Sequence, residues 1–177
     1  MDKKELRKKI RELKRAMTEE QIVSASQRLG ELFLASDYYK NAKTIYGYLP
    51  YNQEVRTVPM LEQALKDGKR VAVPKCYGDE MRFIYMDDLS LVENGYANIP
   101  EPIADGPVAE DKTALVLMPG MAFTKNGDRM GYGGGFYDKF LAAEPDHPTL
   151  ALCYDFQMVE DLPTEDYDIP VDCVLWA

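Results

Sequence analysis

Two short apolar runs, Ala114–Met118 and Thr149–Cys153, constrain the fold of this chain most strongly. Neither run alternates between apolar and polar residues, which is the pattern of a strand covered on both faces. Similar short runs occupy Thr44–Tyr48, Arg70–Val73 and Cys173–Trp176. Strands of this kind are typical of parallel sheets that pack between two layers of helices. We therefore expect an α/β fold with a mainly parallel central sheet.

Segments with helical periodicity precede and separate these runs. The first has apolar residues at steps of four, three and four: Leu6, Ile10, Leu13 and Met17. This spacing predicts an amphipathic helix. Thr18 followed by Gln21 predicts the capping box of a second helix, and a third helix is expected to end at Gly68. Residues 86–112 are rich in Gly, Pro and acidic residues, which predicts irregular structure with one short helix.

The length of 177 residues fits one domain, and we expect residues 1–177 to form it. The net charge of −9 disfavours a general affinity for nucleic acid or anionic membranes. The charge is uneven, however, because residues 1–15 contain eight basic and three acidic side chains. This segment has a net charge of +5 and leaves −14 on the rest of the chain. A basic helix on an acidic protein suits a compact anionic ligand.

The three cysteines, Cys76, Cys153 and Cys173, lie far apart and form no CxxC motif. They suggest neither a disulfide framework nor a zinc site, and they fit a reducing compartment. No apolar run approaches the roughly 18 residues of a membrane span, and the N-terminus lacks the apolar core of a secretory signal. We expect a cytoplasmic protein that has no membrane partner.

Six of the twelve glycines lie between Gly120 and Gly135, after an apolar strand and before a helical pattern that starts at Phe136. A glycine loop between a strand and a helix points free backbone N–H groups at an anion and lets phosphates approach closely. The loop matches neither the Walker nor the Rossmann fingerprint. A tight turn with positive φ angles is the alternative interpretation, and glycine content alone favours the two about equally.

Two charged neighbours favour the phosphate-binding interpretation. Arg129 offers a forked cationic contact to phosphate, and Asp138 lies one turn into the helix, where it can hold a divalent ion. Each residue taken alone is more often a solvated surface residue. Their convergence on one loop makes a nucleotide site the better hypothesis.

Five motifs along the chain resemble the 5-formyltetrahydrofolate cyclo-ligases. They are MPGMAF at Met118–Phe123, GDRMGYGGGFYD at Gly127–Asp138, KKELR at Lys3–Arg7, QEVRT at Gln53–Thr57 and YDIPVD at Tyr167–Asp172. The glycine motif is long and specific, and the five together span almost the whole chain. The resemblance implies an α/β/α sandwich in three layers, similar to the sugar-phosphate isomerases and CoA transferases.

The resemblance also implies an ATP- and Mg²⁺-dependent enzyme that cyclises 5-formyltetrahydrofolate to 5,10-methenyltetrahydrofolate. The implied nucleotide-binding residues are Lys3, Lys4, Arg7, Arg129, Met130, Gly131, Tyr132, Gly133, Gly134, Gly135, Phe136 and Tyr137. The implied substrate-binding residues are Leu49, Glu54, Tyr132, Gly133, Gly134, Gly135 and Phe136. Asp138 and Asp168 match metal-associated aspartates, and we assign catalytic roles to Arg129, Tyr132 and Glu54. An aromatic wall for the pterin is expected near Tyr96–Ile99.

The implied reaction proceeds through an N5-iminium phosphate and releases ADP and phosphate. Some members of the family have a lysine at the position of Gly134, so a lysine contact to phosphate must come from Lys125 or from the N-terminal pair. We expect a monomer that binds small molecules and no nucleic acid.

Two other classes of protein remain as alternatives. A sugar-phosphate isomerase or acyl-CoA transferase would share the fold but need no ATP. A nucleic-acid-binding protein would use the basic N-terminal helix and bind with a steep dependence on salt. For Glu54, the alternative role is an acidic residue that a helix N-terminus favours.

Overall fold

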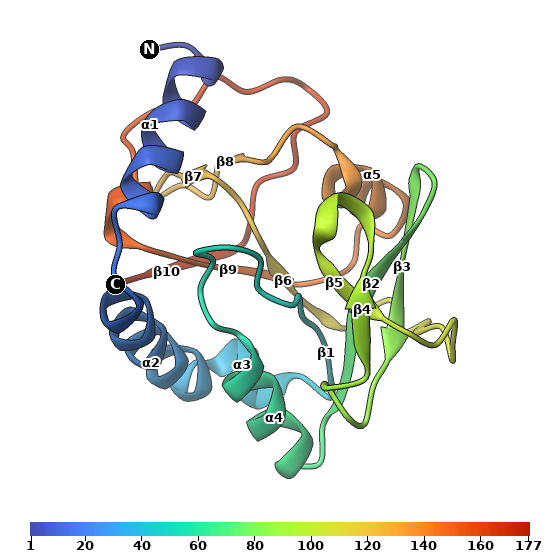
Figure 1. Cartoon of the computed structure of the whole chain (residues 1–177). Helices are drawn as coiled ribbons and strands as arrows, with labels where there is room; N and C mark the ends of the chain where they lie inside the picture. The colour runs from blue at the N-terminus through green and yellow to red at the C-terminus, as the bar shows by residue number, and fades with distance from the viewer.

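A six-stranded sheet lies at the centre of the computed structural model, which describes residues 1–177 (Figure 1). In spatial order the strands are β10 (Cys173–Trp176), β9 (Thr149–Cys153), β6 (Leu115–Met118), β1 (Thr44–Tyr46), β2 (Arg70–Tyr77) and β3 (Glu80–Tyr85). The first five strands run parallel, and only β3 is antiparallel to its neighbour. The expected α/β class with a mainly parallel sheet is confirmed.

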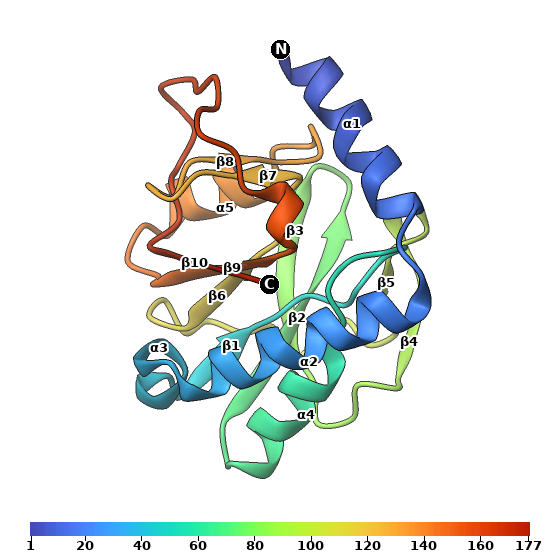
Figure 2. The same cartoon turned by 90° about the vertical axis from the view of Figure 1, so that its left-hand side faces the viewer.

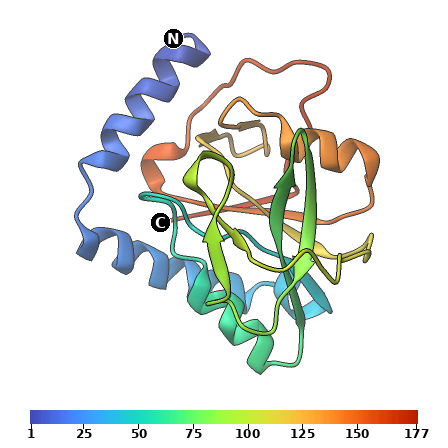
Figure 3. The same ribbon diagram turned by 45° about the vertical axis from the view of Figure 1, so that its right-hand side comes forward.

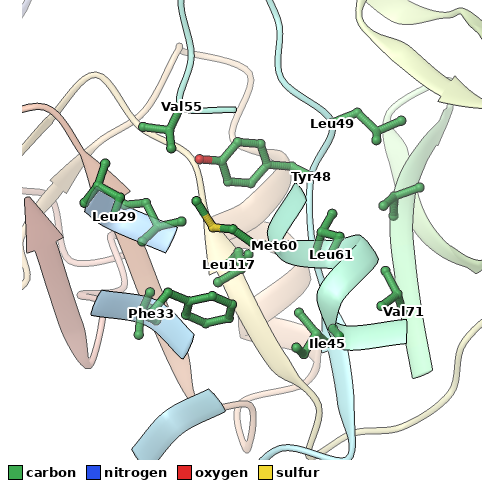
Figure 4. Close-up of a cluster of buried hydrophobic side chains, with 14 of the residues drawn as sticks. Leu29, Phe33, Ile45, Tyr48, Leu49, Val55, Met60, Leu61, Val71 and Leu117 are labelled. Atoms are coloured by element: carbon green, nitrogen blue, oxygen red, sulfur yellow. The ribbon is translucent and has the colours of Figure 1, made fainter. Parts of the chain in front are cut away.

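The chain forms the helices α1 (Lys3–Arg15), α2 (Glu19–Ala35), α3 (Asp37–Asn41), α4 (Val58–Lys66) and α5 (Phe136–Ala143). All of them except α1 cover the faces of this sheet. Leu29 and Phe33 of α2 and Leu61 of α4 pack with Ile45 and Leu117 on one face (Figure 4). The side chains of α5 pack on the opposite face, where the buried cluster includes Leu141. The chain therefore has three layers, with the sheet in the middle.

The two covered faces explain the apolar runs that do not alternate. Leu115 and Leu117 of β6 contribute to the cluster beneath α2 and α4, whereas Val116 and Met118 contribute to the cluster beneath α5. All four side chains are at most 1% exposed. Successive residues of a strand point to opposite faces, so a strand that is buried on both faces needs an apolar residue at every position.

The edge hairpin was not predicted. Strand β2 continues past Val73 to Tyr77, turns at Gly78 and returns as β3, with register pairs from Ala72–Tyr85 to Tyr77–Glu80. Gly78 has a φ of +66°, which a two-residue hairpin turn requires. Strand β3 mixes polar and apolar residues, because an edge strand leaves some of its side chains in water. It therefore lacks the apolar run from which the other strands were predicted.

Shorter elements complete the fold. The region expected to be irregular holds β4 (Val92–Asn94), a 3₁₀ turn at Tyr96–Asn98 and β5 (Pro100–Pro102). The glycine-rich segment contains a small hairpin of β7 (Ala122–Phe123) and β8 (Arg129–Met130). A second 3₁₀ turn occupies Asp155–Gln157.

Helix α1 projects away from the layer formed by α2 and α4, as two further views show (Figures 2 and 3). Its residues Leu6 and Ile10 are buried against Met121 and Met130 of the glycine-rich segment. Leu13 was predicted to lie on the buried apolar face of this helix, and this prediction is wrong, because Leu13 is 38% exposed. No helix has the length and apolar character needed to cross a membrane.

Candidate functional site

A cavity of about 590 Å³ opens where the parallel strands end. The segment that follows β1 contributes Tyr48 and Leu49, and the segment that follows β6 contributes Pro119 and Met121. Cys76 lines the cavity from the second half of β2. Ligands of open α/β sheets commonly bind at the carboxyl ends of the strands. The volume lies within the usual range of small-molecule sites, roughly 300–1,000 Å³.

One face of α1 forms a basic wall of this cavity. The wall residues are Lys3, Arg7, Arg11, Lys14 and Arg15. Their spacing keeps them on one side of the helix, over about 18 Å at 1.5 Å per residue. Because the cavity has a cationic wall of this length, it suits an extended anion.

The glycine loop forms a second wall. Gly135 precedes α5 with a φ of +71° and has no side chain to cap the helix. The N–H groups of the first turn have no acceptors within the helix, and they carry the positive end of its dipole. Arg7 Nε donates to the Gly131 carbonyl oxygen at 3.2 Å, which ties α1 to the loop. The loop and α1 together surround a place for a phosphate group.

Arg129 lies beneath the loop, with only 6% of its side chain exposed. Its Nη2 is 3.2 Å from Asp138 Oδ2, and its Nη1 donates to the Pro119 carbonyl oxygen at 3.0 Å. Gly131 lies close above this guanidinium, since a Cβ at this position would be 2.9 Å from Arg129 Nη1. The Nε of Arg129 is buried and makes no hydrogen bond. The guanidinium therefore supports the loop from below.

Two aspartates, Asp138 and Asp168, line the cavity and pair with basic residues of its walls. Asp138 Oδ1 accepts a hydrogen bond from the Ile169 N–H at 3.3 Å, which brings the preceding residue, Asp168, next to it. Asp168 Oδ2 lies 3.9 Å from Lys3 Nζ. Nowhere in the structure do three or more His, Cys, Asp or Glu side chains form a potential metal cluster. Two carboxylates fit Mg²⁺ that keeps several waters and shares a phosphate, but not an ion enclosed by protein ligands.

At the other end of the cavity a hydrogen-bonded chain joins three segments. Tyr132 of the glycine loop donates to Glu54 Oε2 at 2.9 Å, and Lys14 Nζ donates to the Tyr132 hydroxyl at 3.3 Å. The Tyr51 N–H donates to Glu54 Oε1 at 2.7 Å. Burial raises the pKa of Glu54 and lowers the pKa of Lys14. Burial and the adjacent carboxylate raise the pKa of Tyr132, so its hydroxyl remains a neutral donor.

The structure brings nearly all the expected site residues together in this cavity. The lining includes Lys3, Arg7, Leu49, Glu54, Arg129, Met130, Gly131, Tyr132, Gly133, Gly134, Gly135, Phe136, Tyr137, Asp138 and Asp168. Lys4 does not line it and is exposed. Lys125 is also exposed and outside the lining. Tyr96 and Ile99 do line the cavity, and the Tyr96 ring meets Phe136 at a centroid distance of 5.4 Å.

Sequence reasoning missed several lining residues. Arg11, Lys14 and Arg15 were assigned no role, although their helical spacing from Arg7 was a usable signal. Cys76 had no such signal, because it reaches the cavity through a hairpin that was not expected.

Fold and site together define an α/β protein that binds small anionic ligands at the carboxyl edge of its sheet. The family model described as the 5-formyltetrahydrofolate cyclo-ligase family matches residues 1–177, so the chain belongs to this family. A mouse (Mus musculus) 5-formyltetrahydrofolate cyclo-ligase is 29% identical over 189 residues, which cover 98% of this chain and 93% of that protein. The Escherichia coli K12 protein of the same name is 32% identical over 174 residues and covers 94% of this chain and 95% of its own length.

Two solved structures show the same architecture. The 5,10-methenyltetrahydrofolate synthetase of Aquifex aeolicus superposes with a TM-score of 0.86 at 29% identity, covering 99% of this chain and 90% of that one. The synthetase of Mycoplasma pneumoniae gives a TM-score of 0.78 at 25% identity, covering 98% of each chain.

Proposed function

We propose that this protein is an ATP-dependent 5-formyltetrahydrofolate cyclo-ligase that produces 5,10-methenyltetrahydrofolate, ADP and phosphate. The observation that carries the proposal is a single cavity with two different ends. One end combines Lys3 and Arg7 of α1 with the glycine loop and the start of α5. The other combines Glu54 and Tyr132 with apolar side chains such as Leu49. A triphosphate suits the first end and a reduced pterin the second.

The chemistry requires both ligands in one cavity. The oxygen of an N5-formyl group is a poor leaving group, so it must be activated before N10 can close the ring. The formyl oxygen attacks the γ-phosphorus, the bond from that phosphorus to ADP breaks, and an N5-iminium phosphate forms. N10 then adds to the formyl carbon and loses its proton, and the C–O bond breaks to release phosphate. Catalysis of this kind consists mainly of positioning and charge neutralisation.

The residues of the site divide these tasks. Lys3, Arg7 and the N–H groups at the start of α5 neutralise and orient the phosphates. Arg129 supports the loop and contributes positive charge beneath it. Glu54 accepts hydrogen bonds from the folate, and Tyr132 keeps the Glu54 carboxylate in place.

Mg²⁺ would lie at Asp138 and Asp168, which line the same cavity and belong to segments joined by the Ile169 N–H hydrogen bond. When bound it would supply positive charge that neutralises the phosphates. In this structure both carboxylates are paired, Asp138 with Arg129 and Asp168 with Lys3. These pairs support a role in which each aspartate also orders a cation of the phosphate site.

The proposal extends to organisation and location. We propose that residues 1–177 act as one domain, because the family match spans them and one sheet contains strands from Thr44 to Trp176. The three free cysteines support a cytoplasmic location. We propose that the enzyme acts as a monomer on folate and ATP.

A direct assay tests the function. Purified protein is mixed with Mg-ATP and 5-formyltetrahydrofolate, and the near-UV absorbance of the methenyl product is followed. We expect turnover that stops when ATP or Mg²⁺ is left out. Folded protein that gives no product would refute the proposal. Turnover of a sugar phosphate or a CoA ester without ATP would favour the isomerase and transferase alternative, and RNA binding that weakens steeply with salt would favour the nucleic-acid alternative.

A further inference from the structure

Lys14 is the one basic residue of α1 that is buried. It is 7% exposed, whereas Arg11 and Arg15 of the same cavity wall are exposed. A lysine is rarely buried to this extent unless it has a partner. Its only hydrogen bond goes to Tyr132, whose hydroxyl donates in turn to Glu54. One hydroxyl group therefore links the buried ammonium group of Lys14 to the carboxylate of Glu54.

The Tyr132 hydroxyl determines which groups donate and which accept in this series of hydrogen bonds. It has a single proton, which it donates to Glu54 Oε2 at 2.9 Å, and its oxygen accepts from Lys14 Nζ at 3.3 Å. A protonated lysine has donors only, so it matches the free acceptor of the hydroxyl. A charged Lys14 and an ionised Glu54 satisfy both of these hydrogen bonds.

We propose that Lys14 is a positioning residue that keeps the Glu54 carboxylate ionised and aims it, through Tyr132, at the folate. The proposal rests on the proposed function for the identity of the ligand, but its electrostatic part does not depend on turnover. An ionised carboxylate accepts hydrogen bonds from the N–H groups of a pterin, whereas a protonated one presents a competing donor. Burial works against ionisation of Glu54, and the nearby positive charge of Lys14 works in its favour.

One other cation near Glu54 favours its charged form. It is Arg56 on the same segment, which has a smaller effect than Lys14 and is paired with Glu19 at 3.1 Å. The remaining neighbours are tyrosines from four segments: Tyr48, Tyr132, Tyr137 and Tyr154. Burial raises the pKa of each of these tyrosines, so all four stay neutral between pH 5 and 9. The carboxyl of Glu54 is therefore the acidic group of this cluster whose charge depends on the balance between burial and the nearby cations.

The test compares Lys14→Met with Lys14→Arg and with Lys9→Met. Lys9 is exposed on the same helix and does not line the cavity. Its replacement therefore removes one positive charge and leaves the hydrogen bonds between Lys14, Tyr132 and Glu54 intact. We expect Lys14→Met to lower kcat/KM for the folate about tenfold at pH 7 and to leave the KM for ATP within about twofold. The acidic limb of the pH profile should move to higher pH, because the positive charge that favours the ionised carboxyl of Glu54 is gone. Lys14→Arg should restore the limb, and Lys9→Met should match the wild type.

A second measurement separates this inference from the proposed function. The ¹³C chemical shift of the Glu54 side-chain carboxyl, followed by NMR against pH without ligands, should titrate at higher pH in Lys14→Met. In a Glu54→Gln background, Lys14→Met should produce no further change in the pH profile. If the carboxyl titrates identically in both proteins, or if Lys14→Met weakens folate and ATP equally with an unchanged profile, the role is merely structural and the proposal fails. If the wild type forms no product, but its Glu54 carboxyl titrates at lower pH than the carboxyl in Lys14→Met, only the proposed function is refuted.

Discussion

The pair formed by Arg129 and Asp138 allows a sharp prediction about folding and function together. Arg129→Met keeps most of the side-chain volume but removes the ion pair to Asp138 and the hydrogen bond to Pro119. The Asp138 carboxylate, 22% exposed, then keeps only the Ile169 N–H as a donor. Removing one partner of a buried pair typically destabilises by 3–5 kcal/mol. Because Asp138 is partly in water, we expect about 3 kcal/mol.

For a domain of this size 1 kcal/mol lowers Tm by roughly 2–4 °C, so Arg129→Met should melt about 6–12 °C below the wild type. Urea unfolding should give the same loss of free energy. The double variant Arg129→Met/Asp138→Asn should recover about half or more of it, because no unpaired carboxylate remains. Turnover should nevertheless stay about 10²-fold or more below the wild type, as expected when a preorganised positive charge is lost.

Lys139→Met provides the matched control. Lys139 belongs to the same helix, and its ion pair with Asp79 at 3.5 Å is solvent-exposed on both sides. An exposed pair contributes at most about 1 kcal/mol, so this variant should melt close to the wild type. If Arg129→Met is no less stable than Lys139→Met, or if the double variant is the least stable of the set, the assignment of a buried supporting guanidinium is wrong.

Three further substitutions, at Gly127, Gly135 and Glu54, test the backbone conformation at two glycines and the charge of one carboxyl group. Gly127→Ala should lower the free energy of unfolding by more than about 2 kcal/mol in urea, because Gly127 has a φ of +93° and a Cβ would lie 2.1 Å from the Val171 carbonyl oxygen. Gly135→Ala places a side chain at φ +71° in open space, so it should cost about 1–2 kcal/mol of strain and raise the KM for ATP. Burial raises the pKa of Glu54 in the folded protein above its ordinary value. The charge of Glu54 therefore does not destabilise the folded protein below the ordinary carboxyl pKa, and it destabilises the folded protein fully above the raised pKa. The stability of Glu54→Gln relative to the wild type should therefore grow between pH 4 and pH 7.5, and a constant difference would contradict the raised pKa.

The sheet could be predicted from the sequence because its signals are local. Thr149–Cys153 and Cys173–Trp176 form strands with the predicted bounds, since a strand buried on both faces needs an unbroken apolar run. The capping box at Thr18 likewise appears as expected, since its partner Gln21 is only three residues away. The hairpin that ends in Tyr85 could not be predicted in this way, because an edge strand with mixed polarity differs little from a loop.

The glycine loop and its charged neighbours were also visible in the sequence, since residues 127–138 form one continuous motif. By itself the sequence determined the class of fold, the family and part of the lining of the candidate site. Tertiary structure alone decided which of those residues meet and in what state of charge. Lys14 shows why: helical periodicity places it near the edge of an apolar stripe, but only the approach of Tyr132 and Glu54, 118 and 40 residues away in the chain, buries its charge and gives it a partner.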